Sequence, residues 1–239
     1  RGLSHYVFFF DEEDYNSALP VGDNLMFATP RVPITVSVLA EHPDFMKLLV
    51  EFSLDQDLLQ LAVDMIDLLR QIFGIDGTDH PLFRNLGLDA ESYEKGVDLV
   101  AKRRKDVALT EAEQGQLIAV PFVISAERIG AAFPDIMKTR VLAMRRDHGH
   151  ALQERMDDLF APLRADQAVP GLSVLENALF GKISEGAGSK GDEVRRISAD
   201  LLIEAGIDRL VPGLIFDMPI ALGGPTLPAL YAELLAVSR

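Results

Sequence analysis

Apolar residues recur at steps of three and four along much of the chain, which is the spacing of one helix face. The clearest stripe consists of Leu54, Leu58, Leu61, Met65, Leu68 and Ile72. Gly74 follows it directly, so the pattern predicts a helix that ends at this glycine. A second stripe consists of Phe133, Met137, Val141, Met144, His148, Leu152 and Leu159. It predicts a longer helix that Pro134 begins and Pro162 ends.

Short local patterns predict the remaining elements. "HYVFFF" before "DEEDYN" favours a short strand that ends in an acidic turn. Thr110 with Glu113 three residues later is a capping-box pattern at the start of a helix. "SEGAGSKGDE" has the composition of a loop and precedes the helix "EVRRISADLLIEAGI". Near the end, a Gly/Pro turn leads into a helix with Pro228 in its first turn.

These patterns predict a mainly α fold, a bundle-like helical domain with at most one or two short N-terminal strands. The 239 residues are 48% hydrophobic and 25% charged, which is ordinary for a globular protein. We expect one helical domain over 1–239, with sub-units 1–32 (an entry segment), 33–165 (a helical insertion) and 166–239. The absent initiator Met and the helical pattern that stops at Arg239 lead us to expect a piece of a larger protein.

The balance of acidic and basic residues limits the kinds of partner that the chain can bind. With 23 Lys and Arg against 37 Asp and Glu, the net charge is −14, and nucleic acid is not expected as a partner. The basic pair Arg145-Arg146 falls in a helical pattern, where we interpret it as part of a solvated face. The chain has no Cys, which excludes disulfides and thiolate sites. No apolar run approaches the roughly 20 residues of a membrane span.

One motif, V-x-[DE]-N-x-x-F-[AG], occurs twice, as "VGDNLMFA" from Val21 and "VLENALFG" from Val174. In the first copy its spacing puts Val21 with Leu25, and Asn24 with Phe27, on shared helix faces. The structural interpretation is a short helix whose acid complements the N-terminal dipole and whose Phe is anchored in a core.

Both copies also resemble the "TVAENILFG"-like segment of ABC-type ATPases, which lies just after the glutamine-bearing loop. The second copy has the stronger resemblance because the sequence after it, through "ALGGPTLPALYAELLAVSR", is similar to the family's order of helix, glycine turn and signature. In that register Leu227, Pro228, Ala229, Leu230 and Tyr231 take the places of LSGGQ. Gly223 and Gly224 suit the glycine turn before it.

In the family, this signature binds the γ-phosphate of a nucleotide held by the opposing subunit. The resemblance therefore implies nucleotide-binding positions at Gly224, Leu227, Pro228, Ala229, Leu230 and Tyr231. Pro228 has neither hydroxyl nor N–H, and Leu230 adds bulk where a glycine would admit phosphate, so we expect a weak or inactive phosphate site. The sequence has no phosphate loop and no apolar strand ending in Asp-Glu. The chain alone is then not an ATPase and needs no cofactor, whereas ATP and Mg would belong to its parent protein.

Large bacterial ABC transporter ATPases with a long helical insertion resemble the chain further, since "DYNSALPVGDNLMFATP" is similar to the segment before their insertion. The resemblance implies a helical subdomain that couples ATP binding in an absent nucleotide-binding core to membrane domains. Its contact with the membrane domains would involve Tyr15, Asn16, Asp23, Asn24 and Phe27. The parent would lie on the cytoplasmic, inner face of the plasma membrane, and the resemblance is compatible with a homodimer.

Two other interpretations stay open. The first is a free-standing helical protein-interaction or scaffold domain, in which both motif helices are structural. The second is a metal hydrolase built on Asp147, His148 and other aspartates. The His148-x-His150 spacing argues against a metal, because helix positions two apart diverge by about 200°. The acidic run Asp11 to Asp14 is interpreted as a solvated turn rather than as a cation site.

Overall fold

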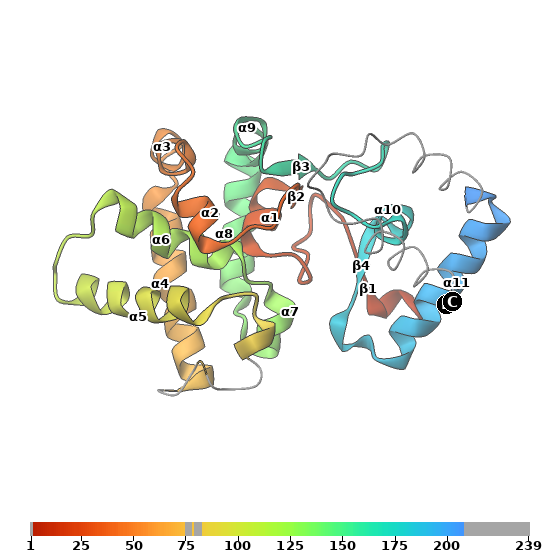
Figure 1. Ribbon diagram of the computed structural model, residues 1–239, viewed down its shortest axis with the longest axis horizontal. Coiled ribbons are helices and arrows are strands. Elements are labelled where there is room, and N and C mark those ends of the chain that lie inside the picture. Colours follow the sequence, from red (N-terminus) through yellow and green to blue (C-terminus); the bar gives the residue numbers. More distant parts are fainter. Residues whose placement is uncertain (1, 75–77, 79–82, 208–239) are drawn as a thin grey trace, which may run out of the picture. The chain divides into compact units, whose positions relative to one another are not determined.

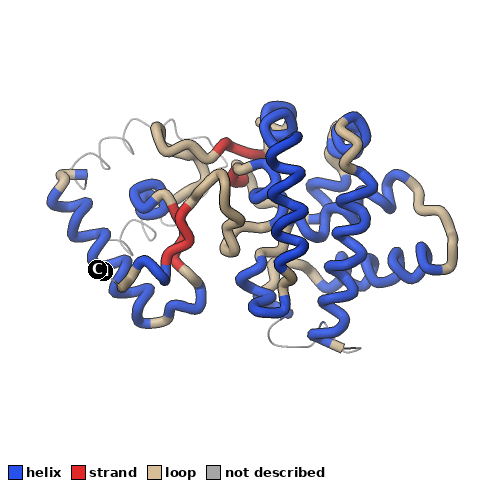
Figure 2. Tube along the Cα trace, turned by 180° about the vertical axis from the view of Figure 1, so that it is seen from behind, coloured by secondary structure: helices blue, strands red, loops and turns tan. Residues whose placement is uncertain are grey.

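The structure is a computed structural model that describes residues 2–74, 78 and 83–207. Figures 1 and 2 show that helices dominate these residues and that the strands are short. The expected mainly α fold is confirmed. Within the described residues, every helix is too short or too polar to cross a membrane.

The chain groups into two compact units, one of which is interrupted in sequence by the other. Unit 1 contains residues up to Phe8 and those from Ser173 onward, and unit 2 contains Phe9–Leu172. The chain therefore begins unit 1, builds the whole of unit 2, and then completes unit 1. This is the connectivity of an inserted domain.

Unit 2 is a layered set of helices around one apolar core. Its α-helices are α1 (Val21–Met26), α2 (Val36–Ala40), α3 (Phe45–Glu51), α4 (Asp55–Phe73), α5 (Ala90–Arg104), α6 (Glu111–Phe122), α7 (Ala126–Ile129), α8 (Asp135–Met144) and α9 (His150–Arg155). Short 3₁₀ turns occur at η3 (Phe83–Asn85) and η4 (Gly130–Ala132). Helix α6 packs against α2, α4 and α5, and α1 packs against α6, α8 and α9 (Figure 1).

Helix α4 confirms the first apolar stripe, with its buried face slightly rotated from the predicted one. Leu58, Leu61 and Met65 are fully buried, and Gly74 caps the helix with φ +70°. Ile72 is 36% exposed, whereas Leu69, one turn earlier, is fully buried. The stripe drifts because a helix turns every 3.6 residues rather than every 3.5.

Helix α6 begins at the predicted capping box. The Glu113 N–H donates to the Thr110 hydroxyl, and the Thr110 N–H donates to the Glu113 carboxylate. Lys102 of α5 donates to both carboxylate oxygens at 2.7 and 2.8 Å. One carboxylate thus completes a helix start and joins two neighbouring helices.

The second predicted helix is present but is not regular. Helix α8 begins after Pro134, which is its N-cap rather than a first-turn residue, and α9 ends at Arg155, before Pro162. Between them lies a π-helical turn, η5 (Arg145–Gly149). A π-turn adds a residue to the helix and rotates every later side chain, which is why the apolar stripe predicted as continuous changes direction here.

Two short strands of unit 2, β2 (Ala28–Pro30) and β3 (Phe160–Pro162), pair antiparallel with Thr29 opposite Ala161. Residues 28–30 follow directly on α1. Neither strand is predicted from the sequence, because three residues are too few to show the alternation of apolar and polar positions that marks a strand.

Unit 1 contains η1 (Ser4–Tyr6), β1 (Val7–Phe9), α10 (Val174–Leu179), β4 (Gly181–Ile183), η6 (Glu185–Ala187) and α11 (Ser189–Glu204). The expected N-terminal strand is confirmed as β1, and it pairs with β4, where Ser184 N–H donates to the Tyr6 carbonyl at 2.8 Å. The loop predicted for "SEGAGSKGDE" is wrong beyond Gly188, because α11 already begins at Ser189. The helix expected after Pro228 lies outside the described residues.

Candidate functional site

The predicted coupling residues of unit 2 gather around an arginine that the sequence analysis assigned to the solvated face. Arg145, at the start of η5, is only 7% exposed, whereas its neighbour Arg146 is exposed. The interpretation of this basic pair as solvated is therefore wrong for Arg145. The sequence contains one indication of this burial. Arg145 follows Val141, a residue of the predicted apolar stripe, by four positions, which places both on the same helix face.

Asn16 and Asn24 form the inner part of this cluster. The Asn16 N–H donates to the Asn24 Oδ1 at 2.8 Å, and the Asn24 Nδ2 donates back to the Asn16 carbonyl at 2.8 Å. The Asn16 side chain also binds the Ala18 N–H and the Phe9 carbonyl. The two asparagines thus fix the turn that leads into α1.

Asn24 is fully buried and satisfies the backbone that precedes its own helix. Its Nδ2 also donates to the carbonyls of Leu19 at 3.0 Å and Pro20 at 3.1 Å. Since a buried polar group without a partner is costly, this set of bonds explains why an amide is found at a core position.

Arg145 joins this turn to the acidic segment before it. Its Nε donates to the Asn24 carbonyl and its Nη2 to the Asn24 Oδ1. Its Nη1 donates to the carbonyls of Glu12 and Asp14 at 2.6 and 3.0 Å. Burial lowers the pKa of Arg145, and the negative charges of the acidic turn, Glu12 first, oppose that change. The guanidinium therefore stays charged and holds three points of the chain together.

The π-turn lets this part of the helix approach α1 closely. A Cβ added at Gly149 would lie 2.7 Å from the Leu25 carbonyl oxygen, a distance that side-chain carbons do not reach. Gln153, one turn further on, donates to the carbonyls of Met26 and Phe27 at 2.9 and 3.1 Å. The backbone at Gly149 thus contacts the backbone of α1. Gln153 of α9 also binds the carbonyls at the C-terminal end of α1, which have no hydrogen-bond partner within α1.

The start of α1 is tied down as well. The Val21 N–H donates to the Ile124 carbonyl at 3.3 Å, and the Glu127 N–H donates to the Ser17 carbonyl at 2.8 Å. The residues around Ile124 and Glu127 therefore hold the start of the segment that contains α1, and Gln153 holds its end.

Both copies of the motif have the same backbone. Phe27 ends α1 with φ 47° and ψ 58°, and Phe180 ends α10 with φ 45° and ψ 54°. A left-handed helix cap on a phenylalanine is unusual, since glycine is the residue that adopts this region without strain. In each copy a three-residue strand follows directly. The shared sequence thus encodes one local structure, a short helix, a left-handed Phe and a strand.

The environments of the two copies differ. Every residue of α1 is buried, and the Arg145 guanidinium lies 5.4 Å from the centre of the half-buried Phe27 ring. No residue of α10 is buried, and Val174 is 40% exposed. The expected core anchoring by Phe is wrong in detail, because Phe27 packs on a cation at the edge of the core. The acid does act at the helix start in α10, where Glu176 and Ser173 form a capping box.

Tyr15 and Asp23 complete the predicted set. The Tyr15 ring packs on Phe133 with ring centres 5.8 Å apart, and its buried hydroxyl has no hydrogen-bond partner among the described residues. Burial raises the pKa of Tyr15 well above its ordinary value, and the charge of Arg145 opposes part of that rise. Asp23 is 2% exposed. The five predicted residues thus lie in one region of unit 2, in which Asn16, Asp23 and Asn24 are buried and Tyr15 and Phe27 are half-buried.

The other predicted positions do not extend this site. Gly224 and the residues Leu227, Pro228, Ala229, Leu230 and Tyr231 lie outside the described part of the chain. His148 is half-buried with its ring 5.9 Å from that of Phe52, and His150 is exposed. Across residues 2–74, 78 and 83–207, no three His, Asp or Glu side chains come close enough to hold a metal ion.

The groups in the Arg145 cluster are a guanidinium, two amides and backbone carbonyls. None of these exchanges protons near neutral pH, so the arrangement fixes the position of a segment and is not suited to acid–base chemistry. No family model matches the sequence, and neither a curated protein nor a solved structure is significantly similar to it.

Proposed function

We propose that the chain is the helical coupling subdomain of a bacterial ABC-type transporter ATPase. In this role it passes movement from a nucleotide-binding core to membrane domains and has no catalytic activity of its own. ATP and Mg are ligands of the parent protein in this proposal.

The observation that carries the proposal is the buried network of Arg145, Asn16 and Asn24. It joins the segment from Phe9 to Phe27 to the rest of unit 2 by buried hydrogen bonds and a cation–ring contact. In the family that the sequence resembles, this segment lies near the membrane-domain contact. A segment that transmits movement between sites must move as one body with its support, and packed, hydrogen-bonded elements do so.

The connectivity gives a second line of support. Unit 2 is inserted between the two parts of unit 1, and strands β1 and β4 pair on either side of that insertion. A helical insertion between two parts of a parent domain is the organisation that the resemblance implies. The same short helix occurs before and after most of the insertion.

The coding sequence around these 239 residues tests the proposal most simply. We expect a G-x-x-x-x-G-K-[ST] phosphate loop upstream of Arg1, and four apolar residues followed by Asp-Glu downstream of Arg239. A reading frame that encodes neither element would overturn the proposal.

The coupling role has its own test in the complete transporter. The Arg145→Lys variant keeps the charge but cannot form the same fork of hydrogen bonds. We expect the substrate transported per ATP hydrolysed to fall roughly five- to tenfold. Arg146→Lys, an exposed neighbouring substitution of the same kind, should leave this ratio unchanged. Equal ratios in the two variants would argue against coupling through Arg145.

A free-standing interaction domain, in which both motif helices are structural, is the second candidate. Leu201 and Ile203 of α11 are 59% and 54% exposed. Residues two apart in a helix point in directions about 200° apart, so these two side chains do not form one apolar patch. The flanking coding sequence separates the two candidates, because only the coupling subdomain requires ATPase elements on both sides.

A further inference from the structure

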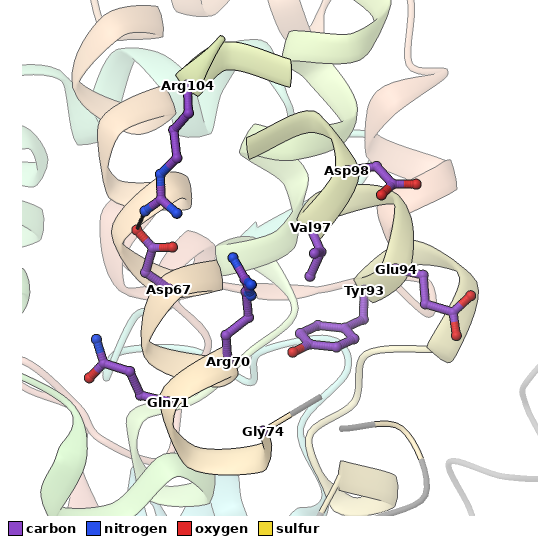
Figure 3. A pocket seen from close by; sticks show the side chains of 9 residues that line it. All are labelled: Asp67, Arg70, Gln71, Gly74, Tyr93, Glu94, Val97, Asp98 and Arg104. Carbon is purple, nitrogen blue, oxygen red and sulfur yellow. Dashed lines mark hydrogen bonds and ion pairs between the residues drawn. The ribbon is translucent and has the colours of Figure 1, made fainter. Parts of the chain in front are cut away.

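A solvent-open cavity of about 720 Å³ lies between α4 and α5, far in sequence from the Arg145 cluster, and several residues that line it, Arg70 among them, are exposed. Its lining includes Arg70 and Gln71 of α4 and Tyr93 and Val97 of α5 (Figure 3). This volume is in the range of sites for small organic molecules, which typically occupy about 300–1,000 Å³.

Arg70 projects between the two helices, as Figure 3 shows. Among the described residues it makes no hydrogen bond or ion pair. Arg104, at one end of the cavity, is instead paired with Asp67 through its Nη2. The two arginines therefore differ: Arg104 is neutralised by Asp67, whereas Arg70 has no partner among the residues that the structure describes.

Tyr93 reaches the same space from α5. Its ring is held by an edge contact with Phe83 at a centroid distance of 5.1 Å, and only 5% of the residue is exposed. Burial raises the pKa of Tyr93, and the nearby positive charge of Arg70 opposes part of that rise. The phenol is then protonated at neutral pH and available as a donor beside the guanidinium.

The acidic residues of the lining do not neutralise Arg70. Asp67 is already paired with Arg104, and the carboxylates of Glu94 and Asp98 point away from Arg70 in Figure 3. Val97 adds apolar surface next to the two donors. Within the described residues, the cavity thus combines an unpaired cation, a neutral donor and an apolar wall.

We propose that the cavity between α4 and α5 binds a small organic anion. Its carboxylate or phosphate accepts hydrogen bonds from Arg70 and Tyr93, and its apolar part lies against Val97. Guanidinium groups bind both kinds of oxyanion through paired hydrogen bonds, and such charged hydrogen bonds are about twice as strong as neutral ones. This site is independent of the proposed coupling function, because it requires only unit 2.

The test uses the 239-residue chain and four probes of similar size: benzoate, phenyl phosphate, benzyl alcohol and benzylammonium. Their affinities are measured by nuclear magnetic resonance titration. We expect one or both anions to bind at least about tenfold more tightly than benzyl alcohol and benzylammonium. Tighter binding of benzoate would identify a carboxylate ligand, and tighter binding of phenyl phosphate would identify a phosphate ester.

Three variants locate the binding. Arg70→Gln should weaken anion binding at least about tenfold, and Tyr93→Phe should weaken it roughly threefold. Arg84→Gln removes an exposed arginine outside the cavity lining and should have no effect. Urea unfolding of Arg70→Gln, compared with Arg84→Gln, checks that both variants are folded. Unchanged affinity in folded Arg70→Gln, equal binding of benzyl alcohol, or no saturable anion binding up to about 10 mM would overturn the proposal.

Discussion

The two motif copies allow a sharp comparison, because the same asparagine occupies very different environments in them. Asn24 and Asn177 are both the fourth residue of V-x-[DE]-N-x-x-F, and both belong to six-residue helices with left-handed Phe caps. Asn24 is fully buried, whereas Asn177 lies in a helix with no buried residue. We predict that Asn24→Ala destabilises its unit strongly and that Asn177→Ala does not.

The expected size follows from the hydrogen bonds that are lost. The Asn24 Oδ1 accepts two hydrogen bonds, and the two Nδ2 hydrogens are shared among three carbonyl oxygens. The Pro20 and Asn16 carbonyls keep backbone bonds from the Asn24 and Leu19 N–H groups. The Asn16 N–H, the Leu19 carbonyl and the Arg145 Nη2 lose this partner. At about 1–3 kcal/mol for each buried group left unsatisfied, we expect a cost of about 4 kcal/mol.

For Asn177 the bond that corresponds to the one between Asn24 and Pro20 goes to the Ser173 carbonyl at 3.1 Å, in a helix that has no buried residue. Water can replace such a bond, so we expect a cost of less than about 0.5 kcal/mol.

Urea unfolding followed by far-ultraviolet circular dichroism measures both variants. Asn24→Ala should lower the midpoint of the transition of unit 2 by more than about 1 M, and Asn177→Ala should leave all midpoints nearly unchanged. Similar losses in both variants would contradict this prediction, because they would assign the loss of stability to helix propensity, which is the same for an asparagine at both sites.

Three further predictions use the same unfolding assay. Tyr15→Phe should raise stability by about 1 kcal/mol, because it removes a buried hydroxyl that has no partner among the described residues; a loss would show that this hydroxyl is bound. Gly149→Ala should lower stability by about 2 kcal/mol, because its Cβ would meet the Leu25 carbonyl; a gain, as at an ordinary helix position, would contradict the close approach. The hydrogen bond from Lys102 lowers the pKa of Glu113, so this carboxylate stabilises the fold above its unfolded pKa, and the contribution disappears as the pH falls through its folded pKa. Glu113→Gln should therefore lower the urea midpoint at neutral pH but not in acid, and a pH-independent difference would count against this ion pair.

Local sequence patterns predicted the parts of the fold that depend on local physics. The stripe that begins at Leu54 and ends before Gly74 fixed α4, and Thr110 with Glu113 fixed the start of α6. Helix periodicity and capping act within one or two turns, so neighbouring residues contain the information. The N-terminal strand was recognised for a similar reason, since β-branched and aromatic residues are concentrated there.

The features that the sequence did not reveal depend on distant contacts. Strand β3 is stable only because it pairs with β2, more than a hundred residues earlier in the chain. Arg145 is buried because the carbonyls of Glu12, Asp14 and Asn24 meet it, and the π-turn that places it there has no sequence signature. A basic pair in a helix is usually solvated, so composition alone favoured the wrong interpretation. The sequence therefore contained the local pattern around Asn24 but did not reveal Arg145, the group that joins these residues.

If Arg145 holds the segment around α1 to unit 2, this segment should be rigid. Hydrogen exchange of the amides in residues 12–27, measured by mass spectrometry, tests it directly in the wild type, Arg145→Lys and Arg146→Lys. We predict that this segment is protected in the wild type and in Arg146→Lys, and that its exchange is at least about tenfold faster in Arg145→Lys. The account would be contradicted if Arg145→Lys exchanged at the wild-type rate, or if the wild-type segment exchanged as fast as an unstructured peptide.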